Sequence, residues 1–195
     1  SITGLLAWLV AALFYCYLSL IISSLTVVKE ELMSLLNIKD AAYGAISSVY
    51  TLAYAVMQIP VGIALDQISV KKLLTMAIFG FSLGCFIIAN TESYQVFLIT
   101  RFVMGAFAAF GVLSAFKLSA EWFSSHHFAT LSGLTVTMGM SGAVLGTSVF
   151  AQMLNHYSIS YMLNSLGIFG LLLAAMSLLV VKNAQPLTGG SKDLS

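Results

Sequence analysis

Residues 60–72, PVGIALDQISVKK, join two long apolar segments of a 195-residue chain. The stretch holds a proline, a glycine, an acid and a pair of lysines, although only 8% of the whole chain is charged. Gly62 and Asp66 stand four residues apart, and Lys71 and Lys72 follow shortly after them. We interpret the stretch as a short polar connection between two helices that cross a membrane.

The composition predicts a membrane protein. Hydrophobic residues make up 59% of the chain, far more than a soluble domain with so few charges could shield from water. The net charge of +1 gives no indication of nucleic-acid binding. Cys16 and Cys85 lie in separate apolar runs, so we interpret them as core residues and not as a disulfide or a metal pair.

Hydropathy predicts six membrane-crossing segments. Each crossing needs roughly 20 apolar residues, and the backbone must satisfy its own hydrogen bonds in hydrocarbon, so the segments should be helices. The predicted helices cover residues 4–28, 41–65, 73–89, 95–120, 128–154 and 159–181. We therefore expect an all-α bundle over residues 1–182, followed by a flexible cytoplasmic linker over residues 183–195, which is rich in Gly, Ser and Pro.

The lysines predict the orientation. With the segments above, Lys71, Lys72, Lys117, Lys182 and Lys192 fall on one side, and Lys29 and Lys39 fall on the other. Lysine is enriched in the cytoplasmic loops of membrane proteins, so both ends of the chain should be cytoplasmic.

Residues 62–71 resemble the loop motif G-x-x-x-D-[RK]-x-G-[RK]-[RK] of the major facilitator superfamily. The matching positions are Gly62, Asp66 and Lys71, and the departures are Gln67, Ser69 and Val70. Two further segments carry the same resemblance. Arg101 and Gly105 fit the R-x-x-x-G motif of the fourth helix, and AEWF at residues 120–123 is similar to the anion:cation symporter branch and related bacterial nutrient permeases.

This resemblance implies the N-terminal half of a transporter. Its six helices would form two inverted three-helix repeats that face a C-terminal six-helix half, in a bacterial inner (plasma) membrane. Ala143 stands where the drug/proton antiporter branch has the proline of a Gly-Pro pair, which favours uptake over efflux.

Arg101 is the sharpest candidate for a substrate contact, because a charge inside a span is costly and its planar guanidinium can bind a carboxylate or phosphate with two hydrogen bonds. Two alternatives are that it snorkels to the lipid headgroups or bonds carbonyls of the first helix. Polar side chains also recur at helical spacing on neighbouring spans, which indicates a cavity between the first, second and fifth spans, or else hydrogen bonds between helices. The predicted substrate-binding residues are Arg101, Tyr15, Tyr43, Ser47, Tyr50, Tyr54, Gln58 and Ser141.

Two other sets of residues receive predicted roles. The resemblance implies that the cytoplasmic charges form a latch between the two halves, whereas an ordinary solvated loop is the alternative. This gating set is Gly62, Asp66, Lys71, Lys72 and Glu121. Glycines spaced by four let helices approach closely, and we expect them to pack within one bundle. The packing set is Gly80, Gly84, Gly105, Gly139, Gly142 and Gly146. The third and sixth spans carry few polar residues and should face lipid.

The predicted function is secondary active transport of a small polar solute by alternating access. The branch resemblance suggests an organic anion, a sugar acid or an amino-acid-like nutrient, with H+ as the coupling ion. A non-transporting six-span subunit or receptor-like protein is the alternative. The chain contains no Walker loop, nucleophile elbow or zinc-protease helix, so we predict no enzyme, no cofactor and no metal site. The expected partners are the lipid bilayer, the solute, H+ and the C-terminal half.

Overall fold

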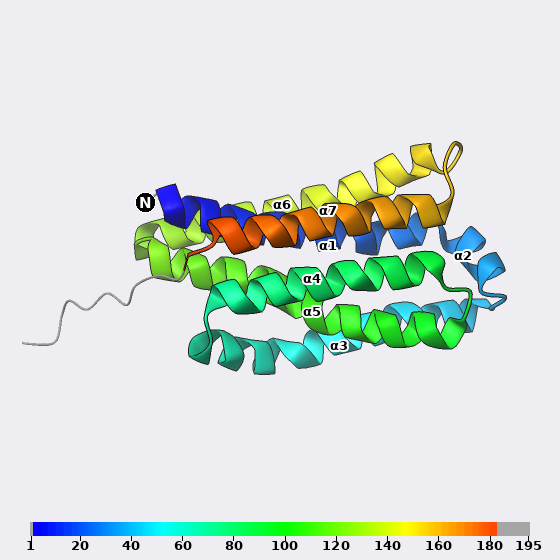
Figure 1. Cartoon of the computed structure of the whole chain (residues 1–195), viewed down its shortest axis with the longest axis horizontal. Helices are drawn as coiled ribbons and strands as arrows, with labels where there is room; N and C mark the ends of the chain where they lie inside the picture. Colours follow the sequence, from blue (N-terminus) through cyan, green and yellow to red (C-terminus); the bar gives the residue numbers. More distant parts are fainter. Residues whose placement is uncertain (1, 183–195) are drawn as a thin grey trace, which may run out of the picture.

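The computed structural model describes residues 2–182, and the predicted linker at 183–195 lies outside the described residues. The described part is all helical (Figure 1). Its helices are α1 (Ile2–Val27), α2 (Lys29–Leu35), α3 (Asp40–Gln67), α4 (Val70–Asn90), α5 (Tyr94–Trp122), α6 (Ser125–Met153) and α7 (Ile159–Val180). All except α2 are long and apolar enough to cross a membrane, which confirms the six predicted spans.

The connection between α3 and α4 is shorter than predicted. Helix α3 continues through Pro60 as far as Gln67, and α4 begins at Val70, so only Ile68 and Ser69 join them. The interpretation of residues 60–72 as a polar connection is therefore wrong in extent. An unpaired backbone group is costly in hydrocarbon, so a helix extends to the membrane surface even where it contains a proline.

Helix α2 is not among the predicted elements. Val28, Leu32 and Leu36 recur every four residues and are buried, whereas Glu30 and Glu31 are exposed. This is the pattern of a short amphipathic helix. It lies at the end of the bundle opposite the N terminus of the chain (Figure 1).

The helix pairs reveal two inverted repeats. In such repeats α1 corresponds to α5, α3 to α6 and α4 to α7. Helix α1 packs against α6, and in the corresponding pair α5 packs against α3. Likewise α4 packs against α5, and α7 packs against α1. Exchanging α1, α3 and α4 for α5, α6 and α7 therefore maps these pairs onto one another, as it does the α1–α5 and α4–α7 pairs. Because each repeat has three spans, the second starts from the opposite side of the membrane, as predicted.

Glycines bring the paired helices into close contact. A Cβ atom on Gly142 or Gly146 of α6 would meet a backbone oxygen of α1, and one on Gly105 of α5 would meet the Tyr50 oxygen of α3. Gly139 faces the Tyr15 ring in the same α1–α6 interface. On α4, Gly80 and Gly84 face Phe107 and Met104 of α5. All six glycines of the packing set thus contact neighbouring helices of the same bundle.

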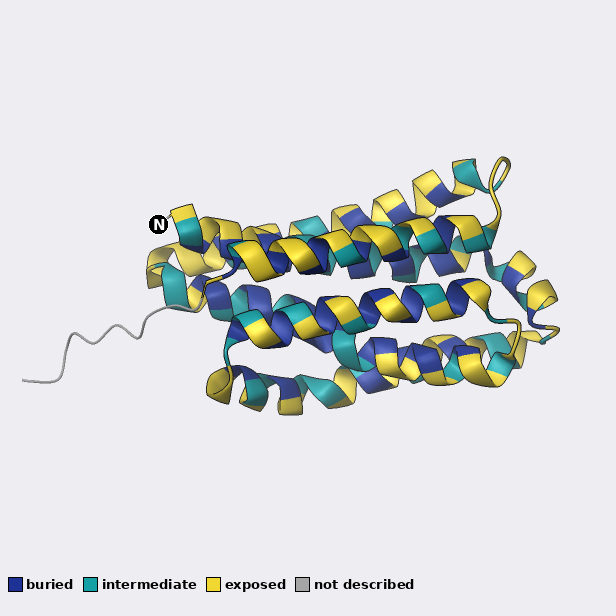
Figure 2. Ribbon diagram, in the orientation of Figure 1, coloured by how far each residue is buried: buried dark blue, intermediate teal, exposed yellow. Residues whose placement is uncertain are grey.

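The distribution of exposed residues differs in part from the prediction. Helix α4 presents a stripe of exposed apolar side chains, and so does α7, in agreement with a lipid-facing role; the stripe on α4 is Met76, Phe79, Leu83 and Ile87. However, α4 is the most buried of the six spans, and α3 and α6 are the least buried (Figure 2). The open face of α3 carries Ser47, Ser48 and Thr51, which are poor lipid contacts.

Candidate functional site

Arg101 lines a partly enclosed cavity of about 140 Å³, which we call the Arg101 chamber. Arg101 lies about two turns into α5 and is only 3% exposed. The walls come from α1, α2, α3 and α5. The other lining residues are Ile22, Leu25, Thr26, Leu32, Tyr43, Ile46, Ser47, Tyr50 and Thr51. Burial of this kind does not fit a side chain that extends to the lipid headgroups.

The guanidinium of Arg101 has an aromatic neighbour but unused donors. Its Cζ atom lies 4.2 Å from the centroid of the Tyr50 ring, which favours a cation through the ring quadrupole. Its Nε and Nη1 atoms and the Tyr50 hydroxyl are buried without a hydrogen-bond partner among the described residues. Buried polar groups are normally hydrogen-bonded, so these donors are suited to the oxygen atoms of an anion.

Helix α2 closes the chamber at the end of the bundle away from the N terminus. Leu32 lines the cavity, and Lys29 Nζ lies 2.7 Å from Asp40 Oδ1 at the start of α3. The hydrogen bond to Asp40 raises the pKa of the Lys29 ammonium group. Tyr43, whose ring lies below Lys29, donates a 2.9 Å hydrogen bond to the Leu25 carbonyl of α1. These contacts hold the first turn of α3 against α1 and α2.

The structure brings together only part of the predicted substrate set. Tyr43, Ser47 and Tyr50 line the chamber with Arg101. The remaining predicted residues, Tyr15, Tyr54, Gln58 and Ser141, do not line it. The Tyr15 ring lies against Gly139 of α6 in the α1–α6 interface. Ser141 is exposed on α6 and donates to the Thr137 carbonyl of its own helix.

The prediction that the fifth span, α6, forms a wall of the cavity around Arg101 is wrong. None of the residues that line the chamber belongs to α6; α2 supplies a wall in its place. Helix α6 is drawn against α1 by its glycines, which turns its buried face toward α1 and away from Arg101. Sequence reasoning also missed Thr26, Leu32 and Thr51. The four-residue spacing of Val28, Leu32 and Leu36 was the signal that could have revealed α2.

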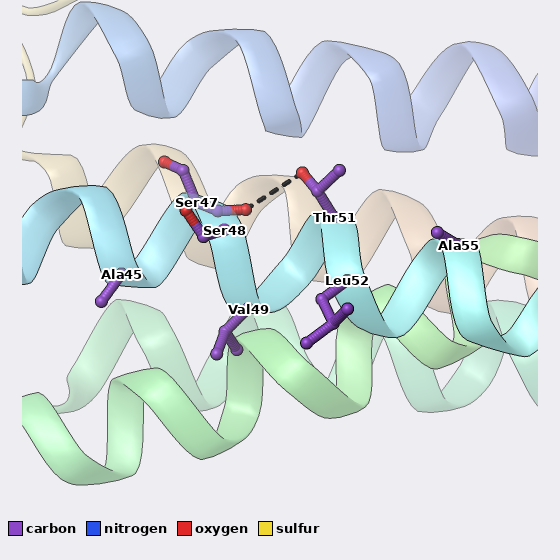
Figure 3. Close-up of a pocket in the computed structure, with 7 residues that line it drawn as sticks. All are labelled: Ala45, Ser47, Ser48, Val49, Thr51, Leu52 and Ala55. Carbon is purple, nitrogen blue, oxygen red and sulfur yellow. Dashed lines mark hydrogen bonds between the residues drawn. The ribbon is translucent and has the colours of Figure 1, made fainter.

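A shallow, open groove, which we call the α3 groove, lies on the exposed face of α3. Its lining residues, drawn in Figure 3, are Ala45, Ser47, Ser48, Val49, Thr51, Leu52 and Ala55. Ser47 and Thr51 line both the groove and the chamber, and the Thr51 hydroxyl donates to the Ser47 carbonyl. Two residues of the chamber wall thus also form part of the uncovered face of α3.

The gating set lies at the other end of the bundle and centres on a residue outside that set. Lys117 of α5 binds Asp66 Oδ1 at 2.6 Å and Glu121 Oε1 at 3.6 Å. Within residues 2–182, neither Lys71 nor Lys72 forms an ion pair with a carboxylate. The Asp66 carboxylate thus ties the end of α3 to α5 of the same bundle. A Cβ on Gly62 would meet nothing within 4 Å.

Removing this ion pair should affect turnover more than binding. The family resemblance implies transport, so we expect Asp66→Asn to lower the transport rate about 5-fold, because an exposed ion pair contributes up to about 1 kcal/mol and the variant should stay folded. Solute affinity should be unchanged, since Arg101 is at the opposite end. The measurement is initial uptake rate and equilibrium binding by the complete natural protein. Glu92→Gln, which neutralises an acid at the opposite end, is the control. Unchanged turnover in Asp66→Asn would leave the loop as a topology signal only.

Comparisons with known proteins agree with this architecture. The sequence profile of the Major Facilitator Superfamily matches residues 7–194. The chain is 24% identical over 163 residues to the "Probable L-galactonate transporter" of Escherichia coli K12, covering 84% of this chain and 36% of that protein. It is 24% identical over 172 residues to the "Probable galactarate/D-glucarate transporter GarP" of the same strain, covering 83% of this chain and 38% of that protein.

A solved structure shares the fold. A bacterial homologue of the human lysosomal transporter Spinster, in an inward-facing and unoccupied conformation, superposes with a TM-score of 0.81 at 15% identity. The alignment covers 99% of this chain and 46% of that protein, so the chain spans less than half the length of the relatives it matches. The matching profile, the six membrane spans and the inverted repeats lead to one conclusion: the chain belongs to the Major Facilitator Superfamily.

Proposed function

We propose that this chain is the N-terminal half of a transporter that moves a small organic anion across the membrane by alternating access. The observation that carries the proposal is the buried Arg101 guanidinium, two of whose nitrogen atoms find no acceptor in the described part of the chain. A permanent positive charge inside an apolar bundle is energetically unfavourable, and such charges in membrane spans typically mark functional sites. A carboxylate of the solute would supply the missing acceptor atoms and the opposite charge.

The relatives suggest the class of anion. The two transporters from Escherichia coli are named for L-galactonate and for galactarate and D-glucarate, and a plant relative is named as a probable anion transporter. These three sugar acids all carry carboxylate groups on a polyhydroxy chain. We assign a sugar acid or a related organic anion to the Arg101 chamber, with the rest of the solute extending past Ser47 and Thr51.

A C-terminal half would complete the transport path. The least buried spans, α3 and α6, offer the faces on which it would pack, and the α3 groove would then lie between the two halves. The lysine distribution supports cytoplasmic chain ends. Proton coupling stays a prediction of the branch resemblance. In the described spans, acids stand only at or next to span ends, at Asp40, Asp66 and Glu121.

Binding of matched solutes tests the proposal. We expect the complete natural protein to bind L-galactonate or D-glucarate at least about 10-fold more tightly than galactitol, a neutral polyol with the same number of carbons. A charge-assisted hydrogen bond is worth about 1.5–3 kcal/mol, which corresponds to this ratio or more. Titration calorimetry on purified protein measures the affinities. Equal affinity for the acids and the polyol would contradict an anion site at Arg101.

A further inference from the structure

We propose that α4 and α7 together bind an anionic phospholipid, with its phosphate between Lys72 and Lys182 and its acyl chains along an exposed apolar strip on both helices. The inference concerns the outer surface of the bundle and depends neither on the Arg101 chamber nor on the transported solute. We call the apolar surface the α4–α7 strip. It is formed by Met76, Leu83, Leu171 and Leu178.

Two hydrogen bonds set the register of α4 and α7. The helices pack side by side and antiparallel, on the same face of the molecule (Figure 1). Near one end the Asn90 side-chain amide donates to the Asn164 amide oxygen at 3.0 Å, and near the other end the Thr75 and Ser177 hydroxyls lie 2.9 Å apart. Residues at equal distances along the two helices from the asparagine pair therefore lie level with each other.

The strip residues share the side of the helices on which the asparagines meet. Seven residues make nearly two helical turns, so Leu83 and Met76, one and two such steps from Asn90, lie on its side of α4. The two leucines of the strip on α7 repeat this spacing from Asn164. Three of the four strip residues are exposed, and the fourth is half-buried. Because the C-terminal half is expected on α3 and α6, this apolar surface is left to the lipid.

The strip ends in two lysines. Lys72 stands four residues before Met76 in α4, and Lys182 stands four residues after Leu178, just beyond the last turn of α7. Both lysines are exposed, and the register of the helices brings them to the same level at one end of the strip. At a rise of about 1.5 Å per residue, Lys72 and Asn90 are roughly 27 Å apart along α4, close to the thickness of the hydrocarbon layer. The lysines therefore lie where lipid headgroups meet the bundle.

Charge selects an anionic lipid for this position. Lys71 and Lys72 lie in the first turn of α4, which contains no acidic residue, and the helix dipole adds positive potential there. The acid that precedes α4, Asp66 at the end of α3, is held by Lys117. Basic pockets between membrane helices bind anionic headgroups, whereas a zwitterionic lipid would bring its own positive group to the lysines. A free phosphate would leave the apolar strip uncovered, so the two features together favour a phospholipid.

Titration with defined lipids tests the site. The complete natural protein, purified in a neutral detergent, is titrated with phosphatidylglycerol, with phosphatidylcholine of the same chains, and with sn-glycerol 3-phosphate. Native mass spectrometry measures the dissociation constant of the first bound molecule. We expect phosphatidylglycerol to bind at least about 10-fold more tightly than phosphatidylcholine, because two lysines each favour the anionic headgroup about 5-fold. Equal affinity for the two lipids would overturn the charge selection. Binding of glycerol 3-phosphate as tight as that of phosphatidylglycerol would overturn a lipid site in favour of a free anion.

Variants at neighbouring lysines localise the effect. Lys72→Gln should weaken phosphatidylglycerol binding about 5-fold, and adding Lys182→Gln should lower it to the level of phosphatidylcholine. Lys71→Gln is the matched control, because it removes the same charge from a residue about 100° around α4 from Lys72 that is only partly exposed. We expect it to change the affinity less than about 2-fold, since a charge off the strip acts only at long range.

The control decides between a site and a diffuse surface charge. Equal losses of affinity in folded Lys71→Gln and Lys72→Gln proteins would overturn the site. Lys72→Arg keeps the charge and should bind phosphatidylglycerol like the wild type, and a loss as large as in Lys72→Gln would overturn the electrostatic cause. Thermal unfolding verifies that each variant is folded, and the comparison of lipids on the wild type decides if the double variant is not.

Discussion

Replacing Arg101 with glutamine is expected to abolish anion uptake, and replacing it with lysine to lower it about 10- to 100-fold. Lysine keeps the positive charge but loses the planar fork that can hold a carboxylate with two hydrogen bonds. Losing one charge-assisted hydrogen bond costs about 1.5–3 kcal/mol, which corresponds to a loss of roughly 10- to 100-fold. Glutamine also removes the charge that attracts the anion into an apolar chamber. The measurement is initial uptake of radiolabelled D-glucarate by the complete natural protein in proteoliposomes.

The control for this series is a lysine near the same end of the bundle. Lys39 is exposed just before α3, so Lys39→Gln removes one positive charge without touching the chamber. Its uptake should match the wild type, and detergent extraction with size-exclusion chromatography should show all three variants inserted and folded. Normal transport by inserted Arg101→Gln protein would make Arg101 a structural cation and remove the main support for an anion site.

Replacing Gly142 with alanine is expected to destabilise the bundle itself. The added methyl group would meet the backbone oxygen and carbonyl carbon of Cys16, and a backbone cannot move aside as a side chain can. Helix α1 would have to separate from α6 along their shared interface, which Gly139 and Gly146 also keep narrow. Overpacking of this kind costs about 1–3 kcal/mol, or a fall in Tm of roughly 2–12 °C for a chain of this size. Thermal unfolding of the purified protein in detergent measures the change.

The same helix offers a matched control. Gly133 also lies in α6, but a Cβ atom there would meet nothing within 4 Å. Gly133→Ala should leave Tm unchanged or raise it slightly, because alanine favours a helix by about 1 kcal/mol over glycine. A similar loss of stability in both variants would show that helix propensity or flexibility, and not the close approach of α1, decides the effect at Gly142.

Hydropathy and residue spacing alone predicted the six spans and the close contacts between helices, whereas the inverted repeats were implied by the family resemblance. The number of spans follows from the thickness of the bilayer, because each crossing needs a long apolar run whose backbone bonds to itself. The glycines at four-residue spacing predicted close helix contacts for a local reason, namely that only a residue without a side chain lets two backbones meet. These properties depend on neighbours along one helix, so an amino-acid sequence can reveal them.

The composition of the candidate site depended on contacts between distant segments. Helix α2, and not α6, forms a wall of the chamber because α6 packs against α1. Lys117 pairs with Asp66 because α3 packs against α5. Helical spacing indicates which residues share a face, but it cannot say which other helix that face meets. Tyr50 meets Arg101, and Ser141 meets the open surface, because the pairing of helices is decided by packing among all six spans at once.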